Sequence, residues 1–150
     1  MMESTVHSLV PTTPLAEGET VIESFHPDKQ AYLWAHVWLA VVAMGAGMVI
    51  LWGIGNPYVW TGGVGGLAAV GLRAWYVASD ELNVRWDLTN RRVLGPQTRA
   101  AMLREIDKVR TLGSAVQIIT TGGDKHLLKF QSDPASTKAR IEAQMGRATG

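Results

Sequence analysis

The sequence predicts an α+β membrane protein, in which a two-helix transmembrane hairpin carries a small antiparallel β-sheet or barrel capped by a C-terminal helix. Three observations lead to this fold class. No Asp, Glu, Lys or Arg occurs from Ala31 through Leu72, and so long an uncharged stretch exceeds what a buried helix in a small globule requires. Short alternating runs separated by turn residues follow it, as in antiparallel strands. Near the C-terminus the apolar period changes to that of a helix.

The predicted transmembrane hairpin, residues 31–79, divides at Gly55-Asn56-Pro57, a turn signal inside an otherwise helical pattern. We therefore predict two spans, at about 33–54 and 58–78, each close to the roughly 20 apolar residues that a bilayer crossing needs. Tryptophans stand at the ends of both spans, where membrane interfaces favour them. They are Trp34, Trp38, Trp52, Trp60 and Trp75.

The basic residues predict the orientation of this hairpin. Lys29 is the only Lys or Arg before the first span, the turn between the spans carries no charge, and all other Lys and Arg residues except Arg73 follow the second span. By the positive-inside rule, both termini are expected in the cytoplasm. Residues 1–30 are polar and acidic, so we expect no cleaved signal peptide. The absence of cysteine fits this compartment and excludes disulfides.

Small residues recur in both predicted spans. Gly62 and Gly66 form a GxxxG motif with Gly63 between them, while the first span offers Gly45 and Gly47. In lipid, small residues allow close packing between helices. These glycines predict a helix-packing interface, and two uses remain open. All of them can close the internal hairpin, or one face can be left for the helix of a partner.

Residues 80–150 predict a soluble domain. Val84, Trp86 and Leu88 alternate with polar residues, and a turn at Thr89-Asn90 leads into a return strand. A third strand is expected in "AMLREI" and another hairpin in "AVQIITTGGDKHLLKF", folded at its paired glycines.

The ends of this domain are also predictable. Asp133-Pro134 is a helix start, and the spacing of Thr137, Ile141 and Met145 predicts a helix over about 134–146 that stops at Gly146. Before the first span, "TVIESF" alternates, so the polar segment 1–30 is able to add a strand at 20–25 to the same sheet.

"DLTNRRVL", "LREIDKVRTLGSAVQIIT" and "SDPASTKARIEAQM" together resemble the bacterial pleckstrin-homology-like (PH-like) domain found in membrane proteins. "LAEGETVIESFHPDK" is similar to the polar segment that precedes the spans in such proteins. The resemblance extends from Leu15 to Met145 and rests on short structural motifs. It implies a PH-like domain with a C-terminal helix, in a protein of the bacterial inner membrane.

Four arginines are candidates for contact with anionic lipid or with an acidic partner. They are Arg85, Arg91, Arg92 and Arg99. Each lies close in sequence to the membrane exit, where a basic residue gains about 1 kcal/mol from an anionic leaflet. The alternative is that they only set the orientation of the spans, which is the simpler role for Arg85. Nucleic acid is a poor partner because the net charge is only +1.

Catalysis finds little support in the sequence. Asp124 and His126 lie across a glycine turn without a nucleophile, paired carboxylates or further metal ligands. His36, in the first span, is able to ligate a metal, but its aromatic neighbours favour a polar interface residue. We expect no enzyme, no cofactor, no metal and no small-molecule substrate.

The expected function is therefore that of a non-enzymatic membrane interaction module. The first hypothesis is an accessory subunit or an assembly or stabilising factor of a larger membrane protein complex, whose subunits are its partners. Membrane proteins with such domains resemble assembly proteins of bacterial photosynthetic complexes. The alternative is a lipid-sensing or homo-oligomeric envelope protein that binds anionic headgroups through its basic domain.

Overall fold

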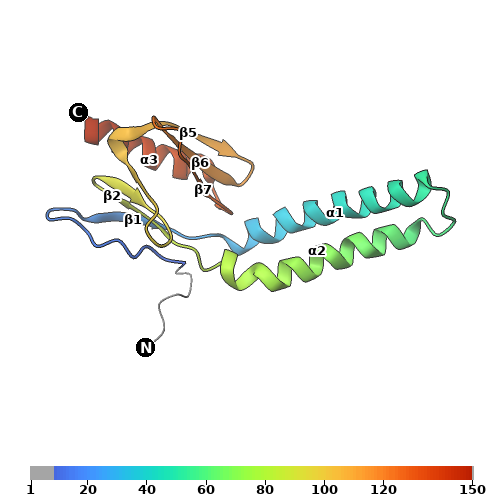
Figure 1. Cartoon of the computed structure of the whole chain (residues 1–150). Coiled ribbons are helices and arrows are strands. Elements are labelled where there is room, and N and C mark those ends of the chain that lie inside the picture. The colour runs from blue at the N-terminus through green and yellow to red at the C-terminus, as the bar shows by residue number, and fades with distance from the viewer. Residues whose placement is uncertain (1–8, 150) are drawn as a thin grey trace.

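A pair of long helices projects from a small β-domain in the computed structural model, which describes residues 9–149 (Figure 1). The helices are α1 (Lys29–Gly53) and α2 (Trp60–Glu81), and they pack against each other as an antiparallel pair. Asp28 caps the start of α1, because its carboxylate accepts a hydrogen bond from the Ala31 N–H at 3.0 Å. Both connections to the β-domain lie at the same end of the pair.

The first sheet contains four antiparallel strands in the order β1 (Val21–Phe25), β2 (Trp86–Thr89), β3 (Arg92–Leu94) and β4 (Ala100–Met102). The strand expected at residues 20–25 is present as β1. It pairs with β2 so that Phe25 lies opposite Trp86, while Val21 lies opposite Thr89. The helical pair is thus inserted between two neighbouring strands of one sheet, and residues from both sides of it build the domain.

The second sheet contains β5 (Ile106–Leu112), β6 (Ala115–Thr120) and β7 (Lys125–Leu128), also antiparallel. A turn of 3₁₀ helix, η2 (Leu103–Glu105), connects β4 to β5. Burial alternates along β6, with Val116 and Ile118 fully buried. This sheet therefore presents one face to the core, as its alternating sequence requires.

The last element, α3 (Pro134–Thr149), packs against β5, β6 and η2. Its start is as predicted, with the Asp133 carboxylate accepting a hydrogen bond from the Ser136 N–H at 3.2 Å. Thr137 and Ile141 are buried. The predicted end at Gly146 is wrong, because the helix continues to Thr149. A helical glycine costs only about 1 kcal/mol relative to alanine, too little to end a helix by itself.

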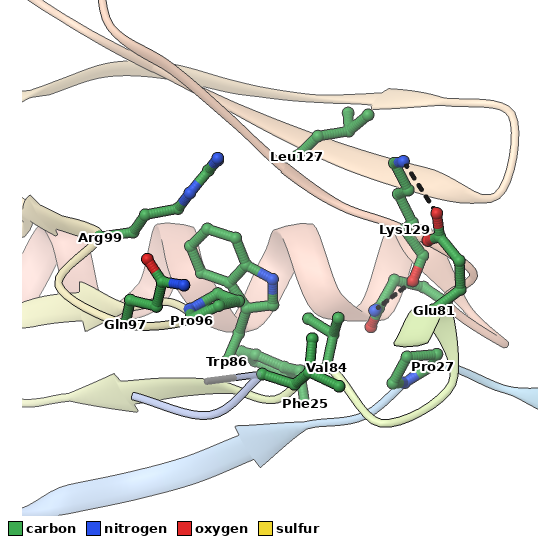
Figure 2. A pocket seen from close by; sticks show the side chains of 12 residues that line it. Phe25, Pro27, Glu81, Val84, Trp86, Pro96, Gln97, Arg99, Leu127 and Lys129 are labelled. Carbon is green, nitrogen blue, oxygen red and sulfur yellow. Dashed lines mark hydrogen bonds and ion pairs between the residues drawn. The ribbon is translucent and has the colours of Figure 1, made fainter. Parts of the chain in front are cut away.

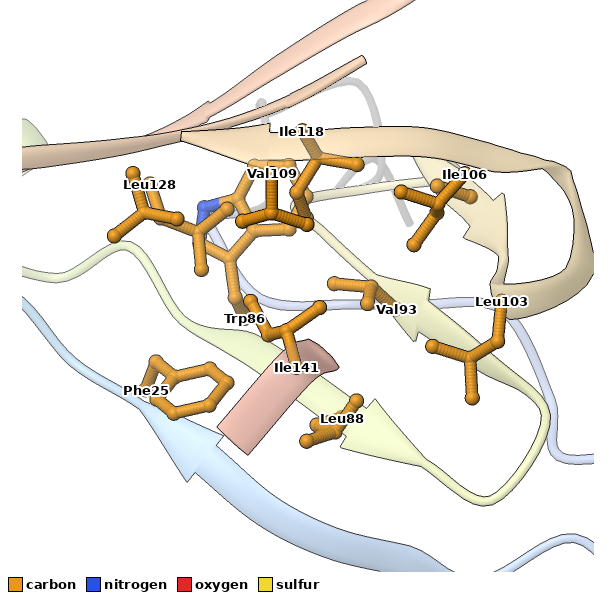
Figure 3. Close-up of a cluster of buried hydrophobic side chains, with 12 residues drawn as sticks. Phe25, Trp86, Leu88, Val93, Leu103, Ile106, Val109, Ile118, Leu128 and Ile141 are labelled. Atoms are coloured by element: carbon orange, nitrogen blue, oxygen red, sulfur yellow. The ribbon is translucent and has the colours of Figure 1, made fainter. Parts of the chain in front are cut away.

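The hydrophobic core lies between the two sheets and α3 (Figure 3). Leu88 and Val93 come from the first sheet, Val109 and Ile118 from the second, and Ile141 enters from α3. Each of these five side chains is at most 4% exposed. The two sheets and the helix therefore share one core, and none of them buries its apolar face alone.

Several predicted boundaries differ from the structure. The turn between β2 and β3 consists of Asn90 and Arg91, one residue later than expected, because the Thr89 hydroxyl accepts hydrogen bonds from the Arg91 and Arg92 N–H groups. The predicted strand "AMLREI" is interrupted: its first two residues end β4, η2 follows, and Ile106 begins β5.

The membrane prediction is supported in part. Among the described residues, α1 alone is long and apolar enough to cross a membrane by length and composition. The predicted second span at 58–78 is helical from Trp60 onward, as part of α2, but its many glycines and Arg73 make it less apolar.

Candidate functional site

The β-domain is fastened to the base of α1 through Phe130. Its carbonyl accepts a hydrogen bond of 2.6 Å from the Asp28 N–H, and its ring packs edge-on against the Tyr32 ring with centroids 5.0 Å apart. The backbone of Phe130 has a φ of 58°, a region that residues other than glycine rarely adopt. The surrounding contacts therefore hold a strained backbone at the junction between domain and helices.

Two further contacts include α2 in this junction. The Tyr32 hydroxyl donates a 2.5 Å hydrogen bond to the Ala74 carbonyl, and Tyr32 itself is only 3% exposed. Lys129, beside Phe130, forms an ion pair with Glu81 at the last residue of α2, with a separation of 3.6 Å. Both helices are thus connected to the same short segment after β7, which orients the domain relative to the pair.

A cavity of about 460 Å³ opens next to this junction, between the first sheet, β7 and the helix ends (Figure 2). Its volume lies within the range of small-molecule sites. Phe25, Val84, Trp86 and Leu127 are among its apolar walls. Pro27 and Glu81 place it at the level where α1 begins and α2 ends.

Trp86 is held in place as one wall of this cavity. The indole lies against Gly95, where an added Cβ would stand 2.5 Å from a ring carbon, so only glycine fits at that position. On another side it meets the His126 ring edge-on, at a centroid distance of 6.0 Å. Trp86 is only 4% exposed, so the cavity wall is formed before any ligand arrives.

Arg99 supplies the cavity with a positive charge. Figure 2 shows its side chain extending toward the space between Trp86 and Leu127. Within residues 9–149 no hydrogen bond or ion pair engages its guanidinium group, whereas Lys129 on the opposite wall is paired with Glu81. Burial lowers the pKa of His126, and the nearby charge of Arg99 lowers it further.

The four candidate arginines do not form one patch. The register of β2 with β1 places the β2–β3 turn, and with it Arg91 and Arg92, at the end of the sheet away from the helices. Arg85 and Arg99 lie at the end next to the helices, before β2 and β4 respectively. A strand of four residues separates the two ends by about 10–13 Å. Arg91 and Arg92 therefore lie away from the helices, although they are close in sequence to the predicted membrane exit.

Arg92 has a structural partner that the sequence did not indicate. Its Nε and one terminal nitrogen each lie 2.9 Å from an oxygen of the Glu19 carboxylate, and Glu19 is only 5% exposed. The Thr89 hydroxyl donates a further hydrogen bond of 2.7 Å to Glu19. The hydrogen bonds from Arg92 hold the pKa of Glu19 at about 2, against the opposing effect of burial. Arg92 is thus engaged within the fold.

The two other arginines differ in their partners. Arg85 forms an ion pair of 3.1 Å with Asp87, which also accepts a hydrogen bond of 2.7 Å from the Ser24 hydroxyl. Arg91 is exposed, and its guanidinium group lies beside Gly18. Of the four arginines, Arg99 alone combines a position next to the helices with a side chain unpaired among residues 9–149.

Four of the five predicted packing glycines lie between α1 and α2. A Cβ added at Gly47 or Gly62 would overlap the backbone of the other residue, and one added at Gly66 would come within 2.5 Å of the Ala43 carbonyl oxygen. Gly63 is buried beside the Met48 side chain. The helices therefore approach closely along these small residues.

Gly45 does not take part in this packing. A Cβ there would meet nothing within 4 Å, and the same holds for Gly65. The chain thus has small residues both inside the helical pair and on its outer surface. Gly45 and Gly65 therefore do not serve the packing of α1 on α2, and whether a partner helix uses them stays a prediction.

The predicted interface tryptophans are all exposed on the helical pair. Trp34, Trp38 and Trp75 lie toward the β-domain, whereas Trp52 and Trp60 lie near the opposite turn. Along α1 the 18 residues from Trp34 to Trp52 span about 27 Å at 1.5 Å per residue. This length is close to the thickness of the bilayer hydrocarbon, about 30 Å.

The residues considered for metal binding or catalysis have other surroundings. The Nδ1 of His36 lies 3.0 Å from the Tyr32 carbonyl oxygen, to which it donates a hydrogen bond in the Nδ1-protonated tautomer, and its ring lies against the Tyr32 ring. Asp124 belongs to the β6–β7 turn, where its backbone bonds to Thr120. In residues 9–149 no three His, Cys, Asp or Glu side chains are grouped as metal ligands.

Comparison with known proteins adds no relative to this description: no protein-family model, no curated protein and no solved structure matches the chain. The functional argument therefore rests on the residues themselves.

Proposed function

We propose that the protein is a non-enzymatic integral membrane module that acts as an accessory subunit, or as an assembly or stabilising factor, of a larger membrane protein complex. In this proposal α1 and α2 cross the bacterial inner membrane as a hairpin, with both termini on the cytoplasmic side. The β-domain is PH-like, an assignment supported by four- and three-stranded antiparallel sheets followed by a C-terminal helix.

One observation carries the proposal: the helical pair exposes large apolar side chains along its whole length. Trp52, Leu72, Trp75 and Tyr76 are 65% to 82% exposed, and α1 buries only Tyr32 and Ala40. Apolar surface of this extent requires a cover of lipid or of another protein. The span of about 27 Å between Trp34 and Trp52 fits lipid, because tryptophans favour both interfaces of a bilayer.

The junction favours an interaction module over a loosely tethered domain. Phe130 and Lys129 contact both helices, so the β-domain has a fixed direction relative to the pair. A partner that packs on the outer small residues, such as Gly45 and Gly65, would meet the domain at a defined position.

Labelling of single cysteines tests the membrane arrangement, and the chain has no native cysteine to remove. Cysteine at Asn56, in the α1–α2 turn, should react with an impermeant maleimide only from the periplasmic side of the inner membrane. Cysteine at Ile22 or Ser132, both exposed positions of the β-domain, should react only from the cytoplasmic side. Labelling of all three positions from one side of the membrane would refute the hairpin.

Purification from the native membrane in a mild detergent tests the partner. A C-terminally tagged chain should bring down other integral membrane subunits at fixed stoichiometry. Gly65→Leu, on the outer surface, should reduce their yield, whereas Val64→Leu, an exposed apolar replacement beside it, should not. A chain that purifies alone or only as a homo-oligomer would overturn the accessory-subunit proposal.

Lipid sensing by the predicted basic surface is the weaker candidate. Arg92 is bound to Glu19, and the Arg91–Arg92 turn lies at the end of the sheet away from the helices. A headgroup site at that turn would face away from the membrane that the helices cross.

A further inference from the structure

The cavity beside the junction combines apolar walls with one uncompensated charge. Phe25 in β1, Val84 just before β2, Trp86 at the start of β2, and Leu127 in β7 contribute apolar surface. The Lys129 charge is balanced by Glu81, which leaves Arg99 as the unbalanced charge among the titratable groups named on the cavity wall. The site therefore suits an apolar molecule that bears one negative charge.

We propose that this cavity binds a single-chain anionic amphiphile of the long-chain fatty acid type, with its carboxylate on Arg99 and its aliphatic chain against Trp86, Phe25 and Leu127. A guanidinium group is able to hold a carboxylate through two parallel hydrogen bonds. The volume of about 460 Å³ is that of a site for a small ligand.

The composition of the walls argues against other ligand classes. A polyphosphate would need several free cations, but among residues 9–149 the cavity is lined by only two, Arg99 and Lys129, and Lys129 is already paired with Glu81. A sugar would need many hydrogen-bond groups, whereas Gln131, one of the few amides here, is already bonded to Thr137 and to the Lys129 carbonyl. An acyl chain needs apolar surface, which these walls provide.

The position of the cavity indicates where such a ligand would come from. Pro27 precedes α1 by two residues and Glu81 ends α2, so the opening lies at the level of the membrane interface if the helices cross as proposed above. Only this source of the ligand rests on the proposed function. Binding itself depends on the domain and can be measured without a bilayer.

Native mass spectrometry of the full chain, purified in a nonionic detergent and titrated with oleate, tests the proposal. We expect one oleate per chain. Arg99→Gln should weaken binding roughly 10- to 100-fold, as expected for the loss of a charge-assisted hydrogen bond, and oleyl alcohol should bind as weakly to the wild type as oleate binds to that variant. Arg91→Gln is the matched control, because Arg91 is also exposed but lies at the other end of the sheet, and it should bind like the wild type.

A second variant separates the cavity from the charge. Leu127→Trp should fill the space and prevent binding, and circular dichroism should verify that the domain is folded. Equal binding by the Arg99 and Arg91 variants, or equal affinity for oleate and oleyl alcohol, would overturn the proposal. So would tighter binding of a short apolar peptide with a free carboxyl terminus. Failure of these tests would leave the cysteine-labelling and co-purification results unaffected.

Discussion

Replacement of Glu19 by Gln should destabilise the β-domain strongly, although Glu19 precedes the helices by ten residues. In the fold the Glu19 carboxylate receives two 2.9 Å hydrogen bonds from Arg92 and one from Thr89, in a site where it is 5% exposed. The Gln side chain retains the shape but removes the charge. Arg92 would then be left beside a neutral group, and breaking a buried ion pair on one side is costly.

The magnitude follows from the pKa of Glu19. A decrease from 4.5 to about 2 corresponds to about 3 kcal/mol at about 1.4 kcal/mol per unit. Because the folded-state pKa is the lower one, the unfolded chain binds the proton more readily. This stabilisation is complete above about pH 4.5 and is lost as the pH falls toward 2.

The assay is thermal unfolding of the full chain in detergent, followed by near-ultraviolet circular dichroism. For a domain of this size a loss of about 3 kcal/mol lowers the Tm by roughly 10–20 °C at pH 7. Glu17→Gln is the control, since Glu17 is exposed, and it should change the Tm little. The Glu19 variant should also lose less stability than the wild type between pH 4.5 and 3. Equal Tm values for the two variants, or parallel acid profiles, would refute the reasoning.

Three other predictions concern the helices, the junction and the cavity wall. Gly62→Ala should destabilise the helical pair by about 1–3 kcal/mol in thermal unfolding, because its Cβ would overlap the Gly47 backbone; Gly65→Ala, in open space, is its control, and equal effects would contradict the packing. Phe130→Ala should loosen the junction, so that the distance distribution between spin labels on α1 and β6 becomes broader than in the control variant Leu127→Ala. An unchanged distribution would show that the Phe130 ring is dispensable for the junction. The pKa of His126 is lowered below 6.5 in the folded chain, so the unfolded chain binds the proton more readily and stability should decline as the pH falls below about 6.5. His126→Gln should flatten this part of the pH profile of the Tm. A profile identical to that of the wild type would exclude His126 as the cause of the decline.

Local patterns in the sequence were sufficient for elements that depend on neighbouring residues. The start of α3 follows from an Asp133 cap and Pro134, and β1 follows from the alternation of Val21, Glu23 and Phe25. Both features act within a few residues. The end of α3 was missed because a glycine lowers helix stability only slightly and packing decides the rest.

The candidate site was less predictable because it depends on distant contacts. The sequence offers no local sign that Arg92 meets Glu19, a residue on the other side of the helices. It also gave no means to separate Arg99 from Arg91, since their positions depend on strand register rather than on distance along the chain. The cavity requires both sheets and the helix ends at once, so it becomes visible only in the fold.

The insertion of the helical pair between β1 and β2 has a consequence for biosynthesis. During translation β1 emerges first and must wait until Trp86, opposite Phe25, has been made. At 5–20 residues per second the intervening segment takes roughly 3–12 s. If the helices cross a membrane as proposed above, the amino-terminal strand must stay throughout this delay on the side of the membrane where β2 will emerge. A chain inserted with one end translocated would leave the two strands on opposite sides, unable to complete the sheet, and its exposed core would make it a substrate for proteolysis. Under that proposal, correct insertion of the helices is a precondition for folding the domain.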